Sequence, residues 1–191
     1  MANNSVYNVG RWEAGRKYLK NNIAFDATTL PIGANIPKNI RYYYSLKDNN
    51  LGNALPAYSD ENWGGIVAVN GKKVPEFLWT SSYNASISHS PKVDRLAFGN
   101  GYEQRIPNGL FSTPINFSAT FEMRNEAEAA AIIHFLRARK GVESFTMRNL
   151  PPIYSDTPGG RKKLFVCPSF DSNLVFFDNY TIKATFAETN H

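Results

Sequence analysis

The feature that most constrains the fold is a stretch where the spacing of apolar residues changes abruptly, from every second residue to the spacing of a helix. Apolar and polar residues alternate over 115–123, as in a strand with one buried face. Asn125 follows as a helix N-cap, with Glu126 and Glu128 in the first turn, where acidic groups suit the positive end of the helix. Ala129 then begins an apolar series at helical spacing. This segment predicts a strand followed directly by a helix.

The end of the same helix is also marked in the sequence. Arg137, Arg139 and Lys140 place cations in the last turn, where they suit the helix dipole. Gly141 can adopt the left-handed conformation that ends many helices. The sequence therefore predicts one α-helix over about residues 126–140.

Short strands are expected on both sides of this helix. The candidates are 23–25, 41–46, 164–167, 174–177 and the alternating stretch 181–186. Thirteen Gly and eleven Pro spread along the chain suit many short strands joined by turns. One helix among such strands predicts a mainly β (α+β) fold, either a β-sandwich or a barrel.

A domain boundary is expected near residue 70. Residues 1–70 are rich in Asn, Tyr and Gly and lack a long apolar period. Asn70-Gly71 lies between two apolar runs and is a hairpin-turn signal, which either closes the first part or starts the second. We expect a small aromatic-rich β module at 1–70 and a second domain at 71–191.

Charge, cysteine content and hydrophobicity make some classes of function unexpected for this chain. The formal net charge is +5 and no segment holds a run of five or six like charges, so nucleic-acid binding is not expected. The densest basic cluster is Arg161, Lys162 and Lys163, which fits a solvated loop, a contact to an acidic neighbouring subunit or a phosphate site. Cys167 is the only cysteine and is expected to be buried on a strand. No membrane-spanning segment is expected, because no stretch of about 18 apolar residues occurs.

Signatures of catalysis are missing from the sequence. Neither HExxH nor GxSxG occurs, and no motif pairs the cysteine with a histidine. His134 lies among apolar helical positions and is expected to be a packing residue, and Gly99-Asn100-Gly101 fits a tight turn. We expect no enzyme, no cofactor and no metal site, and a tail hydrolase is the least favoured of three hypotheses.

One segment carries a resemblance to a known family. Residues 93–110, VDRLAFGNGYEQRIPNGL, resemble the block RFGDGYSQR.P.GL of the minor tail protein M family of lambda-like siphophages. A strand, an acidic helix and a G..SF motif follow in the same order, the last being Gly141, Ser144 and Phe145. The resemblance covers about residues 76–191. It departs from the family after Phe145, where the family's Trp is absent.

The resemblance implies a tail-tube-like fold and a structural role. Family members form a ring at the distal end of the tail tube and adapt the tube to the hub that carries the receptor-binding protein. The implied partners are the tail tube protein, the tail tip hub proteins and further copies in a ring, of six because the tube is hexameric. The implied location is the virion tail tip, reached from the host cytoplasm during assembly.

Assembly-contact candidates come from the family block and the basic cluster. They are Tyr102, Gln104, Arg105, Pro107, Arg161, Lys162 and Lys163. Arg105 either contacts a neighbouring subunit or is a surface residue whose aliphatic stem packs against its own chain. The two alternatives are equally open.

The first module resembles the small carbohydrate-binding modules of chitinases (families five and twelve) in the spacing of its aromatic and Asn residues. Such modules stack sugars on exposed aromatic rings. The implied glycan platform is Tyr42, Tyr43, Tyr44, Tyr18, Trp12 and Trp63. The family's usual binding Trp is replaced here, because Ser45, Leu46 and Lys47 follow the Tyr strand. Two roles stay open, decoration or subunit contact on the one hand and glycan capture by a tail adhesin on the other.

The Tyr strand also predicts how its rings face. Successive strand residues point to opposite sides, so Tyr42 and Tyr44 share one face and Tyr43 takes the other. We expect one of these faces to be exposed, while Trp12 and Trp63 form the core of the module.

Overall fold

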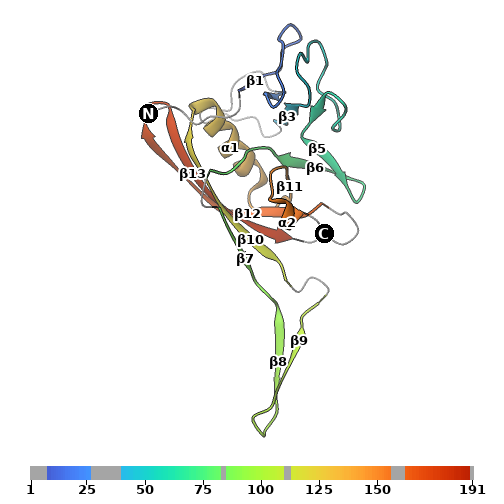
Figure 1. Ribbon diagram of the computed structural model, residues 1–191, viewed down its shortest axis with the longest axis vertical. Helices are drawn as coiled ribbons and strands as arrows, with labels where there is room; N and C mark the ends of the chain where they lie inside the picture. Colours follow the sequence, from blue (N-terminus) through green and yellow to red (C-terminus); the bar gives the residue numbers. More distant parts are fainter. Residues whose placement is uncertain (1–7, 27–39, 83–84, 110–112, 156–161, 190–191) are drawn as a thin grey trace.

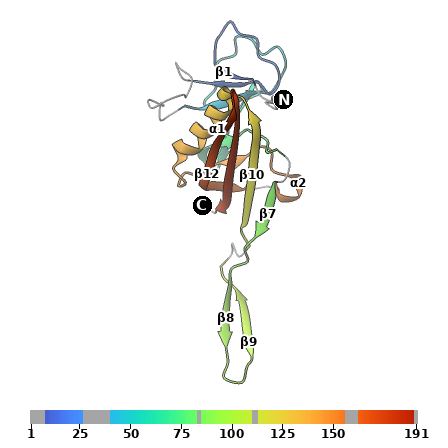
Figure 2. The same cartoon turned by 90° about the vertical axis from the view of Figure 1, so that its left-hand side faces the viewer.

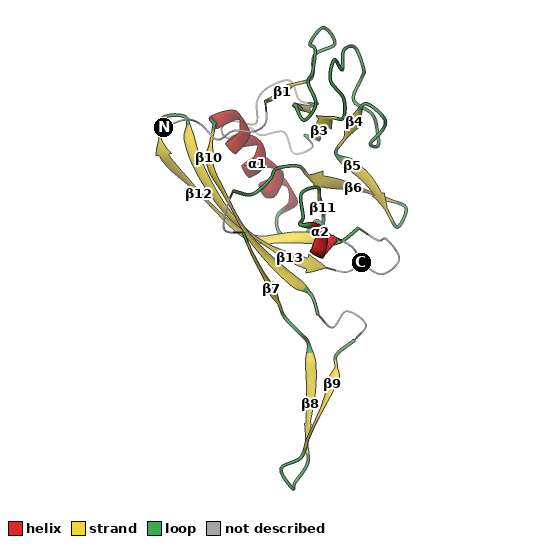
Figure 3. Cartoon of the chain, viewed as in Figure 1, coloured by secondary structure: helices red, strands yellow, loops and turns green. Residues whose placement is uncertain are grey.

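The computed structural model describes residues 8–26, 40–82, 85–109, 113–155 and 162–189. Within them, several small sheets surround one long helix, and a hairpin projects from one end (Figures 1 and 3). The strands are β1 (Val9–Arg11), β2 (Ile23–Phe25), β3 (Tyr42–Ser45), β4 (Trp63–Gly64), β5 (Ile66–Val69), β6 (Lys72–Phe77), β7 (Ser86–His89), β8 (Val93–Ala97), β9 (Glu103–Pro107), β10 (Ile115–Arg124), β11 (Thr146–Met147), β12 (Leu164–Phe176) and β13 (Asn179–Thr189). The helices are α1 (Glu126–Arg139) and the single turn α2 (Pro152–Ser155).

The largest sheet has the order β12-β13-β10-β7, and all its neighbouring strands are antiparallel. The alternation predicted over 115–123 is confirmed as far as Phe121, since every apolar residue up to that point is buried and Ser118 is exposed. Met123, predicted to lie on the buried face, is only half-buried. Phe117 pairs with Phe186 of β13, and their rings stack at 5.9 Å. The apolar face of this sheet packs against α1 (Figure 2).

The end of β10 departs from simple alternation. Met123 has a positive φ of 52°, and the register with β13 shifts between Phe121 and Arg124. This bulge turns Arg124 inward, where its guanidinium meets the Glu128 carboxylate at 2.9 Å with both side chains buried. Glu128, expected to act through the helix dipole, is thus also half of a buried ion pair.

The ends of α1 follow the predicted caps closely. The Asn125 side chain accepts a hydrogen bond from the Glu128 amide at 2.8 Å. The helix ends at Arg139, one residue before the expected end, because Lys140 already has a left-handed φ of 50°. Gly141, predicted to be left-handed, has a φ of 69°.

Two smaller sheets complete the body. Their orders are β1-β2-β3-β4 and β11-β6-β5. The Asn70-Gly71 hairpin is confirmed, since both residues have positive φ between β5 and β6. The mainly β (α+β) class is confirmed, but the described sheets do not join into the closed barrel considered as one alternative.

The proposed boundary at residue 70 falls in the turn of a hairpin, and one core includes residues from both sides of it. Ile23, Phe25 and Tyr42 from the first part pack in the same cluster as Trp79 and Phe135. A second, smaller cluster, formed by Tyr18, Ala24, Tyr43, Trp63 and Ile66, lies wholly within residues 1–70. Independent folding of residues 1–70 stays a prediction, and the shared core weighs against it.

Candidate assembly surfaces

The hairpin of β8 and β9, here called the arm, projects away from the body (Figures 1 and 2). Every residue of both strands is exposed, and the two strands form a sheet of their own. The predicted tight turn closes it, with the Phe98 amide donating to the Tyr102 carbonyl at 2.8 Å and Gly101 at a φ of 80°. The arm therefore presents its whole surface to solvent in the single chain.

The two faces of the arm differ in chemistry. Cross-strand register places Leu96 opposite Gln104 on one face, next to Ile106. On the other face Arg95 lies opposite Arg105, and both guanidinium groups point at Glu103, at 3.7 and 2.7 Å. The first face thus combines two exposed apolar residues with Gln104 and Asp94, and the second carries a charge cluster.

Four assembly-contact candidates lie together on the arm. Tyr102, at the turn, is 75% exposed, and Gln104, Arg105 and Pro107 lie on β9. Phe98 adds a second exposed aromatic ring at the turn. An isolated two-stranded hairpin is only marginally stable in water, so an arm of this kind suits docking on another surface.

The two described lysines of the basic cluster lie outside the arm and form ion pairs within the chain. Lys162 Nζ lies 3.2 Å from the Glu76 carboxylate, and Lys163 Nζ lies 3.1 Å from Glu188. Arg161 lies outside the described residues. The two lysines are therefore not brought together with the arm.

The aromatic rings proposed as a glycan platform are mostly inside the protein. Tyr18, Tyr42, Tyr43 and Trp63 are at most 4% exposed, while Trp12 and Tyr44 are half-buried. The predicted alternation of the Tyr rings is correct, since Tyr42 and Tyr44 face the main core and Tyr43 faces the second cluster. The expectation that one face is exposed is wrong, because β3 lies between two cores.

Each buried Tyr hydroxyl has a partner inside the protein. The Tyr42 hydroxyl lies 3.0 Å from His134 Nδ1, which makes His134 the packing residue that the sequence predicts. The Tyr43 hydroxyl donates to the Pro56 carbonyl at 2.8 Å. Burial raises the pKa of Tyr42 and Tyr43 above the ordinary range. These hydroxyls stabilise the fold and are not presented to a ligand.

Tyr44 occupies a polar seam between the two parts of the chain. Its hydroxyl donates to the buried Glu76 carboxylate at 3.2 Å, and the Arg148 guanidinium lies 3.6 Å from its ring centroid. Arg148 also donates to the Asn21 side chain at 2.8 Å. Burial, followed by the charge of Glu76, raises the pKa of Tyr44 to about 12. Gly64 is needed here, because a Cβ at this position would collide with the Tyr44 ring.

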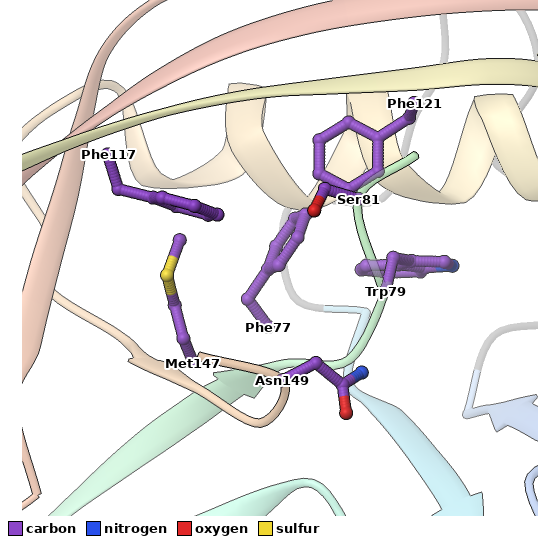
Figure 4. A pocket seen from close by; sticks show the side chains of 7 residues that line it. All are labelled: Phe77, Trp79, Ser81, Phe117, Phe121, Met147 and Asn149. Atoms are coloured by element: carbon purple, nitrogen blue, oxygen red, sulfur yellow. The ribbon is translucent and has the colours of Figure 1, made fainter. Parts of the chain in front are cut away.

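A cleft within the core offers no ligand site (Figure 4). It is lined by Phe77, Trp79, Ser81, Phe117, Phe121, Met147 and Asn149. Its volume of about 10 Å³ holds at most one water molecule.

Sequence reasoning missed one exposed apolar surface. Leu174, Val175, Phe176 and Phe177 are consecutive, and all four are exposed, Phe177 by 91%. The first three end β12, which the sequence divided into two separate strands, and Phe177 follows in the turn to β13. The sequence shows four apolar residues in a row, and only the structure shows that all four are exposed, which is unusual for a surface without a binding role.

Comparison with known proteins agrees with the block that the arm carries. Residues 75–190 match the family described as phage minor tail protein. Tail tip protein M of Escherichia phage lambda is 33% identical over 69 residues, which is 36% of this chain and 62% of that protein. The resemblance of residues 1–70 to carbohydrate-binding modules is not confirmed. Among the described helices, none has the length and apolar character needed to cross a membrane. Because the match spans more than half of its length, the chain belongs to the phage minor tail protein family, a family of structural proteins of the tail.

Proposed function

We propose that the chain forms a ring around the tail axis at the distal end of the tail tube and joins the tube to the tip hub and the receptor-binding apparatus. Similarity to a tail tip protein of phage lambda supports this place in the virion. The observation that carries the proposal is the fully exposed arm, which has no packing partner within the described chain.

The arm suits a contact between subunits for two reasons. Its Leu96–Ile106 face and the aromatic rings at its turn gain free energy when they leave water. A ring also needs heterologous contacts, in which different surfaces of neighbouring copies meet, and a projecting arm supplies one such surface. Tyr102, Gln104, Arg105 and Pro107 are the proposed contact residues on it, and Arg161, Lys162 and Lys163 form a second proposed set.

The proposed ring also implies a number of copies, a set of partners and a location. Six copies would match a hexameric tube, and the partners are the tail tube protein, the hub proteins and the chain itself. The chain assembles in the host cytoplasm and stays in the virion. The glycan-binding adhesin is not advanced, because four of its six candidate rings are buried.

Imaging of tail tips tests the proposal directly. Electron microscopy of particles is expected to show six copies around the axis, between the tube and the hub. A variant in which a short Gly-Ser link replaces 93–107 should keep its melting temperature and lose its place in the particle. Three copies, an off-axis position or normal incorporation of the armless variant would contradict the proposal.

A further inference from the structure

The distal half of β12 is an edge that the protein leaves uncovered. Strand β12 is the last in its sheet, and no described strand pairs with its outer side beyond the single bridge at Phe165. Residues 171–176 are all exposed, and Phe177 follows at the turn to β13. An unpaired edge strand of this length that ends in three exposed apolar residues invites pairing with another strand, and natural proteins normally protect such an edge.

The charge of this edge is one-sided. Residues 169–178 contain Asp171 and Asp178 and no Lys or Arg. The arm has two cations, Arg95 and Arg105, against two anions, Asp94 and Glu103, so its charges balance overall. Arg95, Arg105 and Glu103 share one face of the arm, which therefore carries one net positive charge, while Asp94 lies on the other face.

The arm and this edge also match in backbone chemistry. The arm is a two-stranded ribbon, so each of its strands has an outer edge with free N–H and C=O groups. Strand addition joins two such edges through main-chain hydrogen bonds, while side-chain pockets add specificity. Apolar side chains on both partners, Leu96 and Ile106 on one and Leu174 and Val175 on the other, would be buried together.

We propose that the free edge and tip of β12, residues 169–177, receive the arm of the next copy of this chain. The arm lies beyond one end of the main sheet and the tip of β12 lies at the other end in both views, so one copy cannot join its own arm to its own edge (Figures 1 and 2). Repetition of a contact between two different surfaces closes a ring when the rotation allows it. This inference rests on the proposed ring and names the surface on which its arm docks.

Site-directed cross-linking in assembled tails tests the contact. In a Cys167→Ser background, which keeps a donor for the Ser169 carbonyl, Leu96→Cys is combined with Val175→Cys. Tails are treated with a short bismaleimide and separated under denaturing conditions. The double variant is expected to give dimers and a ladder of higher species, and each single variant should stay monomeric.

A matched variant controls for chance encounters. Val142 is 76% exposed and follows the C-terminal end of α1, whereas the turn after β12 contacts the start of that helix through Asp178 and the Glu126 amide. Leu96→Cys with Val142→Cys should therefore stay monomeric. Imaging of the same tails distinguishes a failure of this contact from a failure of the proposed ring. A visible ring without the Leu96–Val175 ladder, or with equal cross-linking of the control, overturns this inference and leaves the proposed function intact. Tails in which the chain forms no ring overturn both.

Discussion

The arm and the Tyr strand β3 were both expected to expose side chains at the surface, but only the arm does so. Both faces of the arm combine polar and apolar residues, and both are exposed. In β3, Tyr42, Tyr43 and Tyr44 are consecutive, so both faces are aromatic and both are covered. A strand that is apolar on both faces is typical of a position between two packed layers. Aromatic content alone therefore does not identify a binding platform.

The first and largest test of this comparison is removal of residues 1–70. This deletion takes Ile23, Phe25 and Tyr42 out of the main core and uncovers Trp79 and Phe135. We expect residues 71–191 alone to lose cooperative thermal unfolding, as followed by circular dichroism. The armless variant is the control and should unfold like the full chain. A truncated chain with an unchanged transition would show that the shared core is dispensable.

The second test removes one ring from the covered strand. Tyr42 contacts Trp79 at 5.6 Å between ring centroids and lies 3.0 Å from His134 through its hydroxyl. Truncating a large buried aromatic side chain costs about 3–5 kcal/mol, so Tyr42→Ala should lower the free energy of unfolding by that amount. Chemical denaturation of the purified chain measures it. A loss below about 1 kcal/mol would mean that the strand is not held between two cores.

Local patterns predicted much of the fold, because they act over a few residues. The alternation of β10 and β13 identified their buried faces, and Asn125 and Gly141 marked the ends of α1. The bulge at Met123 was not predictable, since it depends on the meeting of Arg124 with Glu128 after the strand and helix pack. Likewise the polar stretch 168–173 resembles a loop, and only pairing with β13 makes it part of one strand.

The sequence predicted the candidate surfaces less well than it predicted the local structure. The arm block and its tight turn were visible in the sequence, but its projection depends on the absence of a neighbouring layer over it. The burial of Tyr42 and Tyr43 depends on residues distant in sequence, such as Trp79 and Pro56. Such long-range contacts cannot be inferred from the spacing of residues along the chain.

The third test uses alkaline pH to examine the seam at Tyr44. The pKa of this hydroxyl is raised from 10.0 to about 12, chiefly by burial, so the folded state holds the proton more tightly than the unfolded chain does. The stabilisation is fully present below pH 10 and is lost as the pH rises towards 12. The melting temperature of the native chain should fall over this window more steeply than that of Tyr44→Phe. Equal slopes would show that Tyr44 is already solvated, as an exposed ring would be.

The smallest effect on stability is expected at the turn of the arm. Tyr102 is 75% exposed, so Tyr102→Ala should change the free energy of unfolding by no more than about 0.5 kcal/mol. Aromatic residues are nevertheless frequent energetic centres of protein interfaces, where truncation costs about 2 kcal/mol or more. The same substitution should therefore leave the melting curve unchanged and reduce incorporation of the chain into tails, as judged by quantitative immunoblotting of purified particles. Tyr58→Ala is the matched control, because Tyr58 is an exposed Tyr of the first part and lies far from the arm. Equal incorporation of the two variants would show that the exposed arm, unlike the buried Tyr strand, contributes nothing to the contacts its surface suggests.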